Sequence, residues 1–394
     1  MDLLELRAIA REVVVQACEL TADLQKRLLS AEIRAKSDLS PVTVADFASQ
    51  ALITLLLAAR CPGLPLVGEE DARAPREDAA LAAKVHESVQ KFIPEVTLEQ
   101  VLEALDKGSH PGGEGRFWVL DPIDGTKGFL RKDQFAVCLC MIDNGKVLVA
   151  ALGCPSLPVD PPPAELGCVF LAARGQGATQ LDLASGRERA IHVSEAVDPS
   201  SCSYVESMES GHSSHGAHAR IAGRLHMLPP IRMDSQCKFG VVARGQASLY
   251  LRCSDRDQQI WDIAAGAMIV EEAGGKAEVT RKSELGRSSE KALSNLAGHR
   301  LTGPAPVLLP GPHGGLCGRL RVQRTHTPSG GRGRDRGRDR VMEKKPSAGF
   351  QGVQPGVASE FNLQQFSRGA PRRVLTGRSL ELGFLALQDT SPGA

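Results

Sequence analysis

Apolar positions near the start of the chain recur every three or four residues, which is the spacing of amphipathic helices. Leu6, Ile9, Val13 and Ala17 would lie on one face of a first helix. A second helix is predicted after Thr43, and its apolar face would be formed by Ala48, Leu52, Leu55, Leu56 and Ala59. The Cys-Pro-Gly triplet at 61–63 should end it, because proline and glycine break helices.

Short apolar runs bounded by turn residues predict strands at 64–67, 117–120, 135–142, 146–152, 169–173 and 178–183. Asn144-Gly145, which separates two of these runs, is a strong hairpin signal. The charged stretch 71–107 is predicted to be helical. Residues 241–243 and 249–252 are predicted to be short β-like segments, and a helix over 263–273 should end at Gly274-Gly275. The pattern predicts an α+β protein whose first sheet is rich in antiparallel strands.

The chain of 394 residues divides into two regions of opposite charge. Residues 281–394 hold 19 Lys and Arg against 8 Asp and Glu, whereas residues 1–280 hold 28 against 38. The arginine tract at 332–340 has no apolar period. We therefore expect sub-domains over 1–185 and 186–280 and a divergent, basic, disordered tail over 281–394. The rival interpretation is a tail strand that replaces one lost from the second sub-domain, and its best candidate is Val307-Leu308-Leu309.

Composition excludes several classes of protein. No apolar stretch reaches the roughly 20 residues of a membrane helix, and no secretory signal is visible. Aromatic residues make up 4% of the chain, which argues against base-stacking nucleic-acid binding. The ten cysteines form no Cys-x-x-Cys pair, so a reducing compartment, the cytoplasm, is expected.

The sharpest chemical signal is the segment that runs from Asp121 to Thr126 and reads Asp-Pro-Ile-Asp-Gly-Thr. A strand delivers Asp121 at its end, Pro122 fixes a turn, and Asp124 follows three residues later, so both carboxylates can face one point. Gly125 permits close backbone approach, and Thr126 offers a hydroxyl and free amides. Such groups suit hard divalent cations held against a phosphate. Ordinary turn chemistry is the alternative interpretation.

Acidic residues stand at three further element ends. Glu69 and Glu70 follow a predicted strand, where a solvated loop is the ordinary role of such a pair. Asp46 and Asp262 each stand at a predicted helix start, where capping alone would explain them.

Together, and in this order, the four acidic clusters resemble the metal-dependent inositol monophosphatase superfamily. Within it, the chain resembles the 3′(2′),5′-bisphosphate nucleotidase branch over about residues 1–280. The branch features are Gly-His-Ser-Ser-His at 211–215, Met-Asp-Ser-Gln-Cys-Lys-Phe at 233–239 and Tyr-Leu-Arg at 250–252. The resemblance implies a layered α-β-α-β-α sandwich of two sub-domains with the site between them.

The resemblance also implies a role for each matching residue. The metal ligands that it implies for two or three Mg²⁺ ions are Glu69, Asp121, Asp124, Asp262 and the backbone carbonyl of Ile123. Glu70 would support them. Asp46 would take up the hydroxyl proton of Thr126, which orients the attacking water. The amides of Gly125 and Thr126 would cradle the scissile phosphate.

Substrate recognition is implied for four residues of the second sub-domain. Lys238 and Arg252 suit a phosphate of a bisphosphorylated nucleotide, while His212 and Ser235 can hydrogen-bond ribose or phosphate. The histidines at 212, 215 and 218 recur every third residue, which is also typical of zinc sites, but no acid or cysteine with suitable spacing follows.

The chain departs from the branch at three places. Ile263 stands where the branch has histidine, the usual proline after Leu251-Arg252 is missing, and the family's last strands and terminal helix have no match beyond Thr280. A shifted reading frame or splice junction, or a genuine RNA-binding extension, would explain the third. Without its last strand the second sub-domain would have an uncovered edge, and the chain would fold poorly or be inactive.

The expected function is Mg²⁺-dependent hydrolysis of the 3′-phosphate of adenosine 3′,5′-bisphosphate and of 3′-phosphoadenosine 5′-phosphosulfate, by a lithium-sensitive cytoplasmic monomer. An inositol polyphosphate 1-phosphatase activity is the alternative within the class. A non-catalytic protein that binds RNA through its basic tail is the alternative outside it. No membrane partner is expected.

Overall fold

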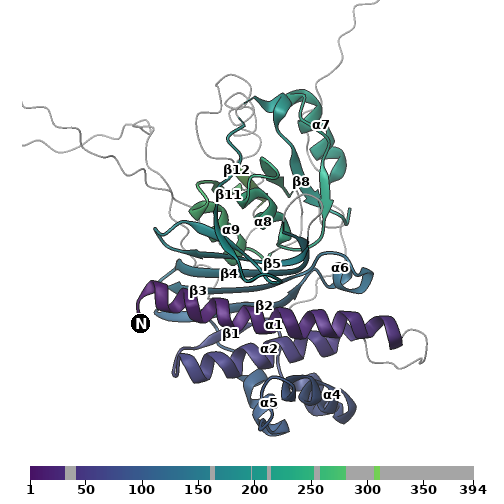
Figure 1. The fold of residues 1–394 in the computed structure, drawn as a ribbon, viewed down its shortest axis with the longest axis vertical. Helices are drawn as coiled ribbons and strands as arrows, with labels where there is room; N and C mark the ends of the chain where they lie inside the picture. The colour runs from purple at the N-terminus through teal and green to yellow at the C-terminus, as the bar shows by residue number, and fades with distance from the viewer. Residues whose placement is uncertain are drawn as a thin grey trace, which may run out of the picture.

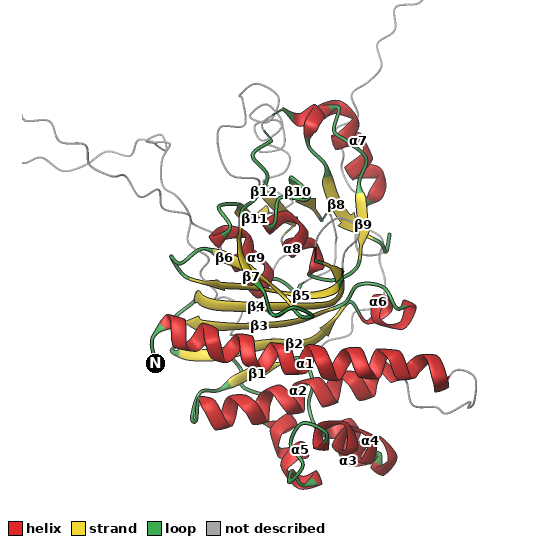
Figure 2. Ribbon diagram, in the orientation of Figure 1, coloured by secondary structure: helices red, strands yellow, loops and turns green. Residues whose placement is uncertain are grey.

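The computed structural model describes residues 1–31, 41–159, 165–196, 198–210, 214–252, 258–280 and 306–310. In Figure 1 and Figure 2 these residues form five layers, in which helices alternate with two sheets. The expected α-β-α-β-α sandwich is confirmed. None of the helices in these ranges is long and apolar enough to cross a membrane.

A seven-stranded sheet forms the first β layer, and its strands lie side by side in chain order. The first two strands pair in parallel, and every later pair is antiparallel. The strands are β1 (Leu66–Gly68), β2 (Arg116–Asp124), β3 (Ala136–Asp143), β4 (Lys146–Pro158), β5 (Leu166–Ala173), β6 (Ala178–Asp182) and β7 (Glu188–Ile191). Each of the six predicted strands, from 64–67 to 178–183, overlaps one of the strands β1 to β6. The seventh strand lies beyond residue 185, so this sheet extends past the expected sub-domain boundary.

Two long helices, α1 (Leu3–Ala31) and α2 (Pro41–Arg60), cover one face of this sheet in Figure 1. Leu6, Ile9 and Val13 of α1 join Trp118 and Val137 of the sheet in one buried apolar cluster. The helical face that the sequence predicts is therefore the face that packs.

The charged stretch 71–107, which was expected to be helical, contains three helices. They are α3 (Arg73–Glu77), α4 (Ala79–Gln90) and α5 (Leu98–Asp106). The Asp78 side chain caps the start of α4, and Thr97 forms a capping box with Gln100 at the start of α5. Buried residues of α4 and α5 pack against α2, on the side away from the sheet.

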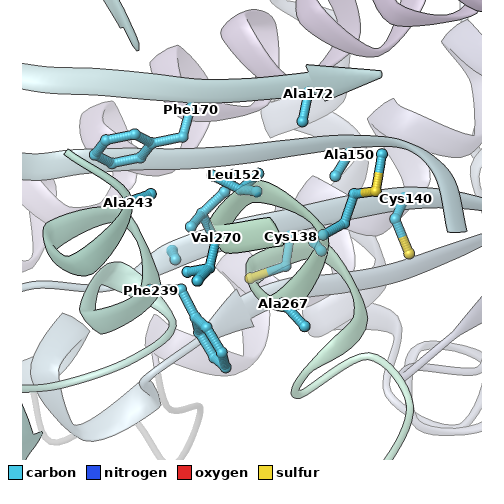
Figure 3. Packing of buried hydrophobic residues seen from close by; sticks show 14 of the residues in the cluster. Cys138, Cys140, Ala150, Leu152, Phe170, Ala172, Phe239, Ala243, Ala267 and Val270 are labelled. Carbon is cyan, nitrogen blue, oxygen red and sulfur yellow. The ribbon is translucent and has the colours of Figure 1, made fainter. Parts of the chain in front are cut away.

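The helices α8 (Cys237–Ala243) and α9 (Ala264–Glu272) form the middle layer. Figure 3 shows Phe239 and Val270 of these helices near Leu152 and Phe170 of the first sheet. The expectation of a β-like segment at 241–243 is wrong. All seven residues of α8 are buried between two sheets, so the helix lacks the polar face that reveals an amphipathic helix in a sequence.

The second sheet has five strands in the order β11-β12-β10-β8-β9, and every neighbouring pair is parallel. Its strands are β8 (Tyr204–Ser207), β9 (Ile231–Met233), β10 (Leu249–Leu251), β11 (Lys276–Thr280) and β12 (Pro306–Pro310). Helix α7 (His215–Leu225) covers its outer face, where Ala222 packs with Tyr204, Leu249 and Leu251. A short 3₁₀ helix, η1 (Pro199–Ser201), precedes β8.

Strand β12 lies inside the region 281–394 that was expected to be a disordered tail, and residues 306–310 depart from that expectation. It lies between β10 and β11, with Val307 opposite both Tyr250 and Ala277. Strand β12 thus joins β10 and β11 in one sheet, because both pair with it. The rival interpretation of Val307-Leu308-Leu309 as a replacement strand is therefore the one the structure supports. The rest of the tail, including the arginine tract, lies outside the described residues.

Candidate active site

The end of β2 presents two carboxylates on one side through an irregularity in the sheet. Asp121 pairs with Cys138 and Asp124 pairs with Ala136. Between these two pairs β2 therefore contains one more residue than β3. Side chains of a regular strand alternate between faces, and residues three apart would point in opposite directions. The extra residue is a β-bulge that brings Asp124 around to the side of Asp121. The turn expected at Pro122 is therefore a bulge inside β2, which ends at Asp124.

The carboxylates of Asp121, Asp124 and Asp262 meet at one point. One oxygen of each lies within 4.8 Å of the others. Asp262 comes from the turn before α9, where its Oδ2 accepts a hydrogen bond of 2.7 Å from the Gln259 amide. The structure therefore brings Asp262 together with the β2 pair, and its role as a metal ligand stays a prediction.

Burial and like charge act together on this centre. Burial raises the pKa of Asp121 well above its usual value, and repulsion from Glu69, Asp124 and Asp262 adds to the shift. Burial also raises the pKa of Asp124 to about 6, although Lys238 opposes the shift. Three carboxylates crowded in this way are costly unless a cation neutralises them.

The two glutamates after β1 flank the same centre. The pKa of Glu69 is raised to about 7, first by partial burial of its carboxyl group and then by repulsion from Glu70 and Asp262. The residue as a whole is still exposed at the surface. The two glutamates also line a cavity of about 290 Å³, whose other walls include His110 and Trp261. Strands β1 and β2 are parallel neighbours, so their carboxyl ends bring these acids to one edge of the sheet.

Gln50 on α2 fixes this glutamate loop, a role that was not assigned from the sequence. Its side-chain nitrogen donates to the Glu70 carbonyl, and its oxygen accepts a hydrogen bond of 3.0 Å from the Glu70 amide. A Cβ at Gly68 would come within 2.5 Å of the Gln50 side chain. The signal that could have found it is an amide side chain within the buried part of α2, because a buried polar group needs hydrogen-bond partners.

Asp46 lies on α2, facing the acidic centre. Burial raises its pKa well above the usual value, with Glu70 and Glu69 adding to the shift. One turn later Ser49 donates a hydrogen bond of 3.1 Å to the Pro122 carbonyl, which ties this part of α2 to the β2 end. Within the described ranges the Asp46 carboxyl and the Thr126 hydroxyl share no hydrogen bond. Their pairing in proton transfer stays a prediction.

The branch segment at 233–239 docks directly onto the end of β2. The Gln236 amide donates to Asp124 Oδ2. Gly125 has a φ of 89° and approaches Ser235 so closely that a Cβ there would lie 2.7 Å from the serine Cβ. Gln236 also donates to the Trp261 carbonyl at 2.7 Å and accepts from the Gly266 amide at 3.1 Å. Gln236 thus links Asp124 to the turn that carries Asp262, a role that was not assigned from the sequence.

The two cationic residues predicted to bind substrate lie beside this centre. Lys238 is buried, and its ammonium donates to the carbonyls of Met233 and Ser235. Burial would lower the pKa of Arg252, but Tyr250, Asp124 and Asp262 together raise it. Their roles in substrate binding stay predictions, and His212 lies outside the described residues. His215 and His218 bond Ser207 and Glu206 respectively.

The donor set fits a hard divalent cation. All the clustered groups offer oxygen, which is the ligand that Mg²⁺ prefers. Asp121 Oδ1 is buried and has no hydrogen-bond partner among the described residues. A buried carboxylate oxygen without a partner is what an oxygen-seeking cation would satisfy. The residues that would hold it are Asp121, Asp124, Asp262, Glu69 and the carbonyl of Ile123.

A five-layered fold with a carboxylate centre at the junction of its sheets defines a class of phosphatases. The chain belongs to the inositol monophosphatase family, whose model it matches over residues 2–299. That match reaches beyond residue 280, where the sequence resemblance was expected to end.

Curated relatives carry the name of the branch that the motifs indicated. A 3′(2′),5′-bisphosphate nucleotidase of Dictyostelium discoideum is 38% identical over 306 residues, which cover 75% of this chain and 92% of the relative. The protein of the same name in Schizosaccharomyces pombe is 38% identical, over 68% of this chain and 83% of the relative. The 3′(2′),5′-bisphosphate nucleotidase 1 of Arabidopsis thaliana is also 38% identical, over 67% of this chain and 82% of the relative. The recognition of the family and of its branch is confirmed.

The chain is also similar, at lower sequence identity, to solved structures. Mycobacterium tuberculosis SuhB is 20% identical with a TM-score of 0.46, over 69% of this chain and 85% of that one. The inositol monophosphatase of Anabaena is 22% identical with a TM-score of 0.45, over 70% and 84%.

Proposed function

We propose that this chain removes the 3′-phosphate of adenosine 3′,5′-bisphosphate and, by the same chemistry, that of 3′-phosphoadenosine 5′-phosphosulfate. The observation that carries the proposal is the docking of the 233–239 segment on the carboxylate centre through Gln236 and Ser235. A site for the reacting phosphate and a cationic site for a second phosphate then lie side by side. The names of the relatives support the same substrate class.

The residues of the first sheet would act on the reacting phosphate. A divalent cation held by Asp121, Asp124 and Asp262 would neutralise phosphate charge and lower the pKa of bound water. The amides that follow Asp124, at the start of α6 (Thr126–Arg131), are free to donate to a phosphate oxygen. The Thr126 side chain is exposed and available to orient a water, and Asp46 is the carboxyl that would take up the proton.

The residues of the second sheet would select the substrate. The charges of Asp124 and Asp262 both raise the pKa of Arg252, so these groups lie near one another. A phosphate bound by Arg252 would therefore lie next to the reaction centre. Arginine binds phosphate through charge-assisted, paired hydrogen bonds. Lys238 adds positive charge from α8, and this charge opposes the rise in the pKa of Asp124.

The test compares substrates with one phosphate and with two. Arg252→Ala should raise KM for adenosine 3′,5′-bisphosphate by about tenfold or more, since a hydrogen bond to a charged group contributes about 1.5–3 kcal/mol. KM for p-nitrophenyl phosphate should change little. Lys238→Ala should act in the same direction, and Lys84→Ala, an exposed lysine on α4, is the control.

Two results would contradict the proposal. Equal changes of KM for both substrates would remove the case for a second phosphate site. Faster turnover of an inositol polyphosphate than of the nucleotide by the unmodified chain would favour the alternative activity. Inhibition by Li⁺ and dependence on Mg²⁺ are expected in the same assay, measured by phosphate release with and without a chelator.

A further inference from the structure

Helix α6 and the loop after β9 lie so close together that no side chain would fit at position 128 of the helix. A Cβ at Gly128 would come within 2.8 Å of the Asp234 Cβ and 2.9 Å of its Oδ2. Gly125, at the start of the same helix, meets Ser235 in the same way. Gly125 and Gly128, one turn apart, therefore allow α6 to contact two successive residues of the 233–239 segment.

An ion pair holds this contact closed. Arg131, the last residue of α6, donates through one Nη to Asp234 Oδ2 and through the other to Glu209 Oε1 at 2.6 Å. Lys127, also on α6, donates to Glu209 Oε2 at 3.0 Å. The Asp234 side chain is 6% exposed and that of Arg131 37% exposed. Asp234 is thus a buried carboxylate whose cationic partner reaches it from the other half of the molecule.

The residues that follow Asp234 are those that face the carboxylate centre. Ser235 has a φ of 62°, a left-handed conformation that serine seldom adopts, and its hydroxyl accepts from the Cys237 amide at 3.2 Å. Gln236 donates its amide to Asp124, and Lys238 folds back onto the Ser235 carbonyl. A shift of Asp234 would therefore move each of these groups.

We propose that Arg131 is a positioning residue that sets the substrate-selecting segment 233–239 against the reaction centre, acting through Asp234. This inference rests on the proposed function for its substrate, but its structural part does not depend on activity. Arg131 is engaged by three carboxylates, those of Asp234, Glu209 and Asp133, so it acts through Asp234 and not by binding phosphate. Glu209, which follows β8, accepts from Arg131 and also from Lys127 on the same helix.

Two measurements test the proposal on Arg131→Gln, Asp234→Asn, the double variant and Arg131→Lys. In hydrogen exchange, the amides of 235–239 should exchange faster in Arg131→Gln than in the unmodified chain. In kinetics, KM for adenosine 3′,5′-bisphosphate should rise about tenfold in either single variant, while kcat for p-nitrophenyl phosphate stays within about threefold. The double variant should be no worse than the worse single variant, and Arg131→Lys should recover part of the loss.

Arg116→Gln is the matched control. Arg116 forms one ion pair with Asp143, at 2.7 Å, at the opposite end of β2 from the site. Unchanged exchange at 235–239 in Arg131→Gln would overturn the positioning role, as would an equal KM effect in Arg116→Gln or simple additivity in the double variant. If the unmodified chain does not prefer the bisphosphate, the proposed function fails, and the exchange data alone then decide whether Arg131 positions the segment.

Discussion

The two sheets of this molecule are built in opposite ways. In the seven-stranded sheet, strands that follow one another in sequence are neighbours in space, mostly as antiparallel hairpins. In the five-stranded sheet all pairs are parallel, and β12 comes from beyond residue 300 to lie between β10 and β11. Parallel neighbours need long crossovers, so the order of such strands is set by contacts between distant parts of the chain. The strand order of the first sheet can therefore be predicted from local sequence signals, whereas that of the second sheet cannot.

The candidate site combines both kinds of construction. The first sheet supplies Asp121, Asp124 and Thr126 from one continuous segment, held by the β2 bulge. The second half supplies Ser235, Lys238, Arg252 and Asp262 from separate turns and helices. We expect changes in the first group, and in Asp262, which lies with Asp121 and Asp124 in the carboxylate centre, to affect hydrolysis of every phosphate ester. Changes in Ser235, Lys238 and Arg252 should affect which ester is chosen.

The largest effect should follow a change at the first sheet. Asp121→Asn should lower cation-dependent phosphate release by at least ~10²-fold for all substrates, because charge stabilisation by a metal contributes several kcal/mol. The melting temperature without added metal should not fall, since the substitution removes a charge from a buried cluster of like charges.

Asp143→Asn is the control for this experiment. Asp143 ends β3 at the far end of the same sheet, where it pairs with Arg116. Its substitution should leave turnover unchanged. Parallel losses of turnover and stability in Asp121→Asn would indicate that the carboxylate has a structural role, and the division of labour between the two sheets would then fail.

The same contrast explains how much of the fold could be predicted. The amphipathic spacing in α1 and the Asn144-Gly145 hairpin are local signals, and both were correct. Helix α8 was mistaken for a β-like segment because burial on all sides removes the polar face. Strand β7 was missed because most of its residues are exposed, so it carries no apolar run.

The candidate site shows a similar limit. The motifs located the acids of the centre, because their spacing reflects strand ends and helix starts. The β2 bulge was mistaken for a turn, since its register depends on the partner strand. Gln50, Gln236 and Arg131 act through contacts with residues far away in sequence, which spacing alone does not reveal.

A second prediction tests the distant strand of the parallel sheet. Leu308 lies in the middle of β12, opposite Leu251 and Glu278. Leu308→Pro removes a backbone donor from an interior strand and should lower the free energy of unfolding by about 2 kcal/mol. Amides of β10 and β11 should then exchange faster, whereas those of β3 and β4 should not.

Leu308→Val is the matched control, because it keeps the N–H group and suits a strand. An unchanged melting temperature and unchanged exchange in Leu308→Pro would show that β12 does not hold the second sheet together. That result would also revive the expectation that the tail is separate from the fold.

The smallest effect is expected at the outer edge of the first sheet, where Glu188 of β7 is held to α1. Its carboxylate accepts from Arg7 and, at 2.7 Å, from the Thr179 hydroxyl, and it lies 3.7 Å from Arg11. Burial alone would raise the pKa of Glu188, but these partners outweigh it and lower the pKa below the ordinary 4.5. A lowered pKa in the folded state means that the ionised form stabilises the fold.

This stabilisation should be present above about pH 4.5 and lost as the pH falls through the lowered pKa, because protonation then removes the charge that Arg7 pairs with. Glu188→Gln should therefore lower the free energy of unfolding at pH 7 by about 0.2–1 kcal/mol, the range of a solvent-accessible ion pair. The difference between variant and unmodified chain should shrink in denaturant titrations at successively lower pH. Glu19→Gln, on the exposed side of α1, should show no such pH dependence. A difference for Glu188→Gln that persists unchanged into acid would mean that packing of β7, and not the charge pair with α1, fixes this edge of the sheet.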